Sequence, residues 1–157
     1  MTSTATTPTT TPTATPTATT TTATTTATTT ATTRTLAWFS IPVLDLDRAT
    51  RFYESMLDTT LRREISGGVP MAIFSAADGA GSSDGGLVQD PHGSKPAAAG
   101  ALIYLSAGAS VAAALERARR AGGAVDGPVI ELPREIGYVG FVHDTEGNRV
   151  GLHAPGR

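Results

Sequence analysis

The sequence predicts an α+β domain built from two β-α-β-β-β modules and preceded by a tail without regular structure. Residues 1–33 are almost wholly Thr, Ala and Pro, whereas the remainder carries hydrophobic residues at strand and helix periods. In that remainder, the order strand, helix, three strands occurs twice at a period of about 60 residues, with negligible identity between the halves. Two such modules side by side would form a curved mixed sheet with a central cleft and the helices outside.

The tail, residues 1–33, has no charged residue and no large side chain after Met1. Such a segment cannot bury enough apolar surface to offset the entropy of ordering its backbone, so we expect disorder, with some polyproline II character. It also lacks the basic start and the apolar segment of a secretory signal. A Thr/Pro-rich tract can be an O-glycosylated stalk, but a solvated tail or a misplaced start codon is the favoured interpretation.

The body, residues 34–157, is predicted to contain modules at about 34–92 and 99–157. In the first, strands are expected within 35–43, 60–66, 69–76 and 86–90, and a helix within 45–58 that Asp45 or Asp47 caps. The second module is predicted to have strands within 100–107, 124–133, 137–144 and 148–154. Its helix, within 109–123, begins at Ser110 and ends at Gly122 and Gly123.

Composition excludes several classes of function. The formal net charge is −2 and no basic run is present, which argues against nucleic-acid binding. No apolar run approaches the roughly 20 residues that cross a bilayer, so we expect no membrane partner. Cysteine is absent, which excludes disulfides, thiol nucleophiles and thiolate metal sites and fits a reducing compartment. We therefore expect the protein to be cytoplasmic.

Two motifs carry a family resemblance. The stretch WFSIPVLDLDRATRFYESML, Trp38–Leu57, and the stretch HDTEGNRVGLH, His143–His153, resemble the opening and closing motifs of the vicinal oxygen chelate superfamily. That superfamily includes glyoxalase I, bleomycin-resistance proteins and extradiol dioxygenases. The resemblance covers nearly all of the body and is closer to the glyoxalase-like branch. It implies a cleft in which up to four side chains, one from the first and one from the last strand of each module, bind a divalent ion that chelates two substrate oxygens.

The metal ligands that the resemblance implies are missing. Carried over by position, they fall on Trp38, near Leu87, near Leu102 and on Gly151, none of which offers a suitable lone pair. A shift of one residue brings equally inert side chains, namely Phe39, Val88, Ile103 and Leu152. We therefore predict no metal and no cofactor at this site.

Four residues are predicted to contact a ligand instead: Trp38, Ser40, Tyr104 and His153. Strand alternation puts Trp38 and Ser40 on one face and Phe39, Ile41 and Val43 on the other, against the helix. By the same rule Leu102, Tyr104 and Ser106 share a face, and His153 shares one with Gly151. These side chains suit an aromatic or amphipathic ligand. The alternatives are that the aromatics plug the cavity and that His153 is a histidine at the rim.

The other polar residues are assigned structural roles. His143 precedes a turn, and His92 lies in a solvated loop; the three histidines lack metal-ligand spacing. Arg134 and Glu135 belong to a solvated loop, with a lid as the alternative. Arg62, Arg63 and Glu64 are expected on a solvent-facing strand edge. The glycine-rich loop 77–86 lacks the GK[ST] ending of a phosphate-binding loop and is assigned to a loop or hairpin.

The leading functional hypothesis is a metal-independent protein that binds an amphipathic or aromatic small molecule. The alternative is a lyase, isomerase or dioxygenase with a displaced metal site, for which no catalytic residue is identified. A third possibility is a structural or regulatory partner whose cleft is filled by its own side chains. The resemblance and the open edges of curved sheets also predict a homodimer. If each cleft closes only between the subunits, its lining will include residues of both chains.

Overall fold

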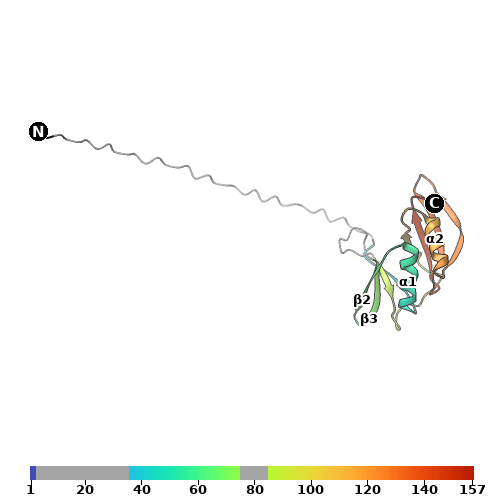
Figure 1. Cartoon of the computed structure of the whole chain (residues 1–157). Coiled ribbons are helices and arrows are strands. Elements are labelled where there is room, and N and C mark those ends of the chain that lie inside the picture. The colour runs from blue at the N-terminus through green and yellow to red at the C-terminus, as the bar shows by residue number, and fades with distance from the viewer. Residues whose placement is uncertain (3–35, 75–84) are drawn as a thin grey trace. The chain divides into compact units, whose positions relative to one another are not determined.

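The computed structural model describes residues 1–2, 36–74 and 85–157. The tail and most of the glycine-rich loop, about which disorder and loop structure were predicted, lie outside these described residues. All of the described helices and strands belong to the compact unit Arg34–Arg157. Figure 1 shows α1 and α2 side by side in this unit. Within the described part of the chain, no helix has both the length and the apolar character needed to span a membrane.

The first module contains one helix and one four-stranded sheet. Its elements, in chain order, are β1 Phe39–Pro42, α1 Leu46–Leu57, β2 Leu61–Ser66, β3 Val69–Phe74 and β4 Gly85–Val88. The strand order is β1-β4-β3-β2, with β1 parallel to β4 and the other pairs antiparallel. The α1 N-cap is Asp45, whose side chain accepts a hydrogen bond from the Arg48 N–H.

The second module repeats this arrangement. Its elements are β5 Tyr104–Ser106, α2 Val111–Arg120, β6 Ala124–Leu132, β7 Gly137–His143 and β8 Arg149–Ala154. The strand order is β5-β8-β7-β6, with β5 parallel to β8. Ser110 caps α2 as predicted, because its hydroxyl accepts from the Ala113 N–H. The predicted α+β fold with two β-α-β-β-β modules is confirmed; β5 is shorter than the predicted strand.

One hydrophobic core joins the two modules. The helices pack against each other, and the core includes buried residues of both: Ala49, Phe52, Tyr53 and Met56 from α1 and Val111, Ala114, Leu115 and Ala118 from α2. Ile41 and Val43 face this core, as alternation predicted, and Phe39 packs beside them against Phe74. The helices therefore cover one face of each sheet. We call the opposite face of each sheet, which carries Ser40 in the first module and Tyr104 in the second, its inner face.

A polar network fixes the second module to α1. Tyr53 donates from its buried hydroxyl to Asp144 Oδ2 at 2.7 Å, and Asn148 donates both to that oxygen and to the Pro42 carbonyl. The Glu146 carboxylate accepts from the Leu44 and Asp45 N–H groups and from the Arg48 guanidinium. Burial, and then the Asp144 carboxylate, raise the pKa of Tyr53 well above its ordinary value. The turn between β7 and β8 therefore sets the position of β8 relative to β1.

Candidate functional site

The inner face of the second sheet is organised in rows that run across the strands. The register places Asp126, Phe141, Gly151 and Tyr104 opposite one another on β6, β7, β8 and β5. A neighbouring row holds His143 and Arg149, and the row on the other side holds Ile130, Val139, His153 and Ser106. Adjacent strands are about 4.8 Å apart, so side chains within one row are in reach of each other.

Gly151 leaves a notch in the middle of the central row, and the Tyr104 ring occupies it. A Cβ placed on Gly151 would lie 2.5 Å from Cδ1 and 2.7 Å from Cε1 of Tyr104. The same ring meets Phe141 edge-on, with 6.0 Å between the ring centroids. Tyr104 nevertheless remains 50% exposed. The space into which a longer side chain at position 151 would extend therefore holds an aromatic ring with an open outer face.

Arg149 lies on the other side of Phe141. Its guanidinium carbon is 4.3 Å from the centroid of the Phe141 ring, and its Nε donates to Asp126 Oδ2 at 2.7 Å. This hydrogen bond holds the pKa of Asp126 below its ordinary value, although partial burial acts in the opposite direction. His143 lies 3.9 Å from the same carboxylate oxygen. A stacked, ion-paired arginine thus stands beside the aromatic pair.

His153 contacts the backbone of the β6–β7 connection. Its Nε2 lies 2.9 Å from the Ile136 carbonyl oxygen, and this contact links β8 to the end of the β6–β7 connection. In that connection the Ile136 N–H donates a hydrogen bond to the Pro133 carbonyl, so Arg134 and Glu135 are the two central residues of a tight turn. Both residues are exposed. The solvated-loop assignment of these two residues agrees with this geometry. His153 is partly exposed and lies in the row next to that of Tyr104 on the inner face.

The first sheet's inner face is built on the same plan with different side chains. Its central row runs Ser40, Gly86, Ile73 and Arg62 on β1, β4, β3 and β2. Trp38 lies next to this row, 39% exposed, and donates from its indole Nε1 to Ser40 Oγ at 3.1 Å. The predicted pairing of Trp38 and Ser40 on one face is thereby confirmed.

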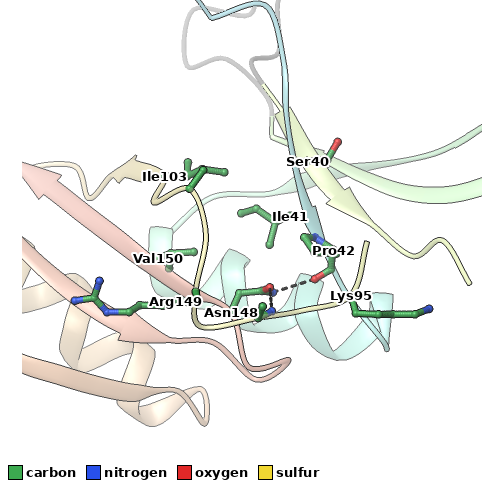
Figure 2. A pocket seen from close by; sticks show the side chains of 11 residues that line it. Ser40, Ile41, Pro42, Lys95, Ile103, Asn148, Arg149 and Val150 are labelled. Atoms are coloured by element: carbon green, nitrogen blue, oxygen red, sulfur yellow. Dashed lines mark hydrogen bonds between the residues drawn. The ribbon is translucent and has the colours of Figure 1, made fainter. Parts of the chain in front are cut away.

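A small hollow separates the two sheets. It has a volume of about 120 Å³ and is lined by β1, by residues between Lys95 and Ile103, and by the start of β8. Figure 2 shows Ile41 and Ile103 on either side of this hollow, and the charged ends of Lys95 and Arg149 extending away in opposite directions. In its lining, the hollow combines the polar side chains of Ser40 and Asn148 with the apolar side chains of Ile41, Ile103 and Val150. Its edges, at Ser40 and Arg149, connect the inner faces of the two modules.

The four predicted ligand residues form two pairs. Trp38 and Ser40 are hydrogen-bonded on the first sheet, while Tyr104 and His153 lie in neighbouring rows of the second. Among the described residues, no hydrogen bond or ring contact joins one pair to the other. Sequence reasoning missed Arg149, Phe141 and Asp126. Alternation from Gly151 could have placed Arg149 on the inner face, but the cluster itself depends on the register of three strands.

The residues at the superfamily's metal-ligand positions do not fit a metal ion. Trp38 and Leu102 offer no lone pair that a metal ion can bind, and the Gly151 position is covered by the Tyr104 ring. The position near Leu87 falls on Gly86 or Val88, because Leu87 itself is fully buried in the core and its two neighbours are the inner-face residues of β4. Neither Gly86 nor Val88, the residue that a one-residue shift brings, offers a lone pair for a metal ion. Within the described residues, no three His, Asp or Glu side chains are grouped to hold an ion.

Comparisons with known proteins agree with the architecture. The family model described as Glyoxalase/Bleomycin resistance protein/Dioxygenase superfamily matches residues 35–152. A glyoxylase/bleomycin resistance protein/dioxygenase domain from Frankia sp. EAN1pec has a TM-score of 0.58 at 21% identity, covering 78% of this chain and 98% of that one. A glyoxalase/bleomycin resistance protein from Albidiferax ferrireducens T118 has a TM-score of 0.54 at 17% identity, covering 77% and 97%.

Glyoxalase I from Zea mays has a TM-score of 0.57 at 20% identity over 76% of this chain. The matched region spans 46% of the maize protein, so this chain corresponds to about half of it. No curated protein sequence matches the chain. At these identities, the solved structures establish a common fold and do not assign a ligand or a reaction.

Proposed function

This chain belongs to the Glyoxalase/Bleomycin resistance protein/Dioxygenase superfamily, and from that premise we propose that it binds an aromatic or amphipathic small molecule without a metal ion. The proposed contacts are Trp38 and Ser40 on the first inner face and Tyr104 and His153 on the second. The protein would hold the ligand, and sequestration rather than turnover would be its role. The absence of cysteine from the chain supports a cytoplasmic setting.

The observation that carries this proposal is the Tyr104 ring over Gly151. A glutamate at position 151 would have to displace that ring, since even a Cβ would meet it at 2.5 Å. The chain therefore combines the loss of a donor with an aromatic surface in the same space. Partly exposed aromatic side chains offer a flat apolar wall with a polar end, which suits an amphipathic ligand.

We also propose that the protein is a homodimer. In their sheets, β1 and β5 are both terminal strands, and edge strands of this kind invite pairing with another chain. The exposed aromatic side chains Trp38 and Tyr104 lie on or beside these strands, so a second copy could complete the ligand's enclosure. Light scattering with size separation would test this, and a monomer at all concentrations would contradict it.

Two measurements test the binding proposal. Elemental analysis of the dialysed protein should show no stoichiometric Zn, Fe, Mn or Ni, because the superfamily's ligand positions carry no side chain that can bind a metal ion. Addition of 2-naphthol should quench or shift the fluorescence of Trp38, the only tryptophan, and should raise the melting temperature by mass action. A stoichiometric, protein-coordinated ion would favour the metalloenzyme instead.

The Tyr104→Ala variant sharpens the test. It should weaken 2-naphthol binding, since it removes the ring that covers Gly151. Ile65→Ala is the matched control, because Ile65 is also an exposed apolar strand residue, 77% exposed, but lies outside the inner-face rows. An unchanged affinity in Tyr104→Ala would reject Tyr104 as a ligand contact.

A further inference from the structure

The chemistry around Phe141 restricts the class of ligand. We propose that the ligand is an aromatic carboxylate, with its ring on Tyr104 and Phe141 and its carboxylate on the two η nitrogens of Arg149. This inference deepens the proposed function and rests on it. It starts from Arg149, whose position was not anticipated from the sequence.

Arg149 is held in place from two directions before any ligand arrives. Phe141 lies under the guanidinium plane at 4.3 Å, and Asp126 takes the Nε hydrogen at 2.7 Å. A cation over an aromatic face and a charge-assisted hydrogen bond both favour a fixed orientation. The side chain is 32% exposed, so the group is ordered without being enclosed.

The hydrogen-bonding edge of Arg149 is available. Asp126 binds Nε, and no described residue accepts a hydrogen bond from either η nitrogen. These two nitrogens form the planar fork that matches a carboxylate in bidentate geometry. Figure 2 shows the guanidinium extending away from Asn148 and Lys95, so the fork does not point into the hollow between the sheets. The fork is therefore presented on the second module's side of the site.

The aromatic surface lies at a matching position. Phe141 is contacted by Arg149 at 4.3 Å and by Tyr104 at 6.0 Å between centroids, so it stands between the cation and the exposed ring. A planar ligand stacked near Tyr104 would extend across Phe141 toward Arg149. An anionic group at its end would then meet the fork, and a neutral polar end would gain less from it.

Charge also distinguishes an anion from a cation here. Asp126 is the acidic group of the cluster, and both Arg149 and His143 lie beside it. Its charge is thus already balanced by the Arg149 guanidinium, whereas four of the five N–H donors of Arg149, those on the η nitrogens, have no acceptor among the described residues. A ligand cation would compete with Arg149 for Asp126, but a carboxylate would add to the existing contacts.

The test compares three probes with one ring system: 2-naphthoate, 2-naphthamide and 2-naphthylmethylamine. Calorimetric titration of the full chain should give at least tenfold tighter binding of 2-naphthoate than of the amide, and the weakest binding for the amine. Arg149→Gln should remove the preference for naphthoate while leaving amide binding nearly unchanged. Arg149→Lys should recover only part of it, because lysine keeps the charge but loses the fork.

Arg120→Gln is the matched control, since it makes the same charge change at an exposed position on α2. It should retain the full preference for naphthoate. Equal binding of naphthoate and naphthamide, both sensitive to Tyr104→Ala, would overturn the carboxylate inference and leave the proposed function standing. Tightest binding of the amine would also overturn it, and failure of all three probes to bind would instead reject the proposed function.

Discussion

In the first sheet the central inner-face row is Ser40, Gly86, Ile73 and Arg62, whereas the corresponding row of the second sheet is Tyr104, Gly151, Phe141 and Asp126. Both rows have a glycine on the strand next to the edge. Above Gly86 the space is closed by backbone and by Ile73, but above Gly151 it is filled by a side chain that is half exposed. The same fold therefore makes a packed surface in one module and an adjustable aromatic surface in the other.

This difference concerns the central rows alone, because Trp38, beside the packed row of the first sheet, remains 39% exposed. The second module also supplies the Asp144–Asn148 turn, whose buried polar groups are hydrogen-bonded to the first module and to each other. Fully satisfied buried polar groups fix a single geometry. Tyr104 and Arg149, by contrast, stay partly exposed, and only part of the hydrogen-bonding capacity of Arg149 is used among the described residues.

The largest expected effect comes from breaking the turn that joins the modules. Asp144 accepts from the N–H groups of Glu146 and Asn148 at Oδ1 and from the side chains of Tyr53 and Asn148 at Oδ2. In Asp144→Asn an NH₂ group replaces one of these oxygens, and this hydrogen-bond donor would face the N–H or O–H groups that the oxygen had accepted from. We expect the free energy of unfolding to fall by about 3 kcal/mol, measured by chemical denaturation.

Asp58→Asn provides the control for this change. Asp58 ends α1 in a left-handed conformation, φ 54°, which asparagine tolerates well, and its side chain is exposed. The control should change the stability by less than about 0.5 kcal/mol. If the two variants were equally stable, the network would not be what fixes the second module to α1.

Much of the fold could be predicted from the sequence, because the spacing of hydrophobic residues indicates which side chains of a helix or strand are buried. The apolar positions of α1 and α2, the cap Ser110 and the alternation along β1 all follow from local patterns. The local pattern also limited the cap of α1 to Asp45 or Asp47, and the structure has Asp45. The same local reasoning placed Trp38 beside Ser40. These features depend on residues within one turn of a helix or a few residues of a strand.

The features that could not be predicted from the sequence depend on the register between strands. On β4, Gly85 and Gly86 carry no side chain, so no alternation showed that Leu87 faces the core and Gly86 the inner face. The contact of Arg149 with Phe141 and Asp126 involves three strands, and a one-residue slip in any of them would separate the groups. Sequence patterns fix which residues alternate but do not fix their partners.

The comparison of the two glycines can be tested directly. A Cβ on Gly86 would lie 2.9 Å from the Ala72 carbonyl oxygen and 3.1 Å from Ile73 Cδ1 in a buried strand, so backbone must move. Gly86→Ala should therefore cost about 2 kcal/mol. Gly151→Ala should cost about 1 kcal/mol or less, because Tyr104 can rotate outward from its half-exposed position.

The double variant Gly151→Ala/Tyr104→Ala separates the two effects of the change at position 151. If the ring is the obstacle, the cost of Gly151→Ala should vanish when Tyr104 is already alanine, which a double-mutant cycle in urea would measure. A larger cost for Gly151→Ala than for Gly86→Ala would mean that Tyr104 is held as firmly as the core. In that case, the second inner face would be a packed surface like the first.

The smallest effect concerns the charge of Glu146 in the joining turn. Burial disfavours its charged form, but the hydrogen bonds from Arg48 and from the Asp45 and Leu44 N–H groups outweigh this, and the pKa of Glu146 lies below its ordinary 4.5. A carboxyl with a depressed folded-state pKa stabilises the fold above its unfolded-state pKa and loses that contribution as the pH falls through the folded-state pKa. Near neutral pH, the free energy of unfolding of the wild type should therefore exceed that of Glu146→Gln by about 1 kcal/mol.

The difference between these two proteins should shrink as the pH is lowered below 4.5, which urea titrations at a series of pH values would show. Glu116→Gln is the control, because Glu116 is 60% exposed and pairs only with Arg119 on the surface of α2 among the described residues. Surface pairs contribute little, so this control should differ from wild type by less than about 0.5 kcal/mol at neutral pH. A Glu146 difference that stayed constant down to acidic pH would show that the carboxylate's shape, and not its charge, holds the modules together.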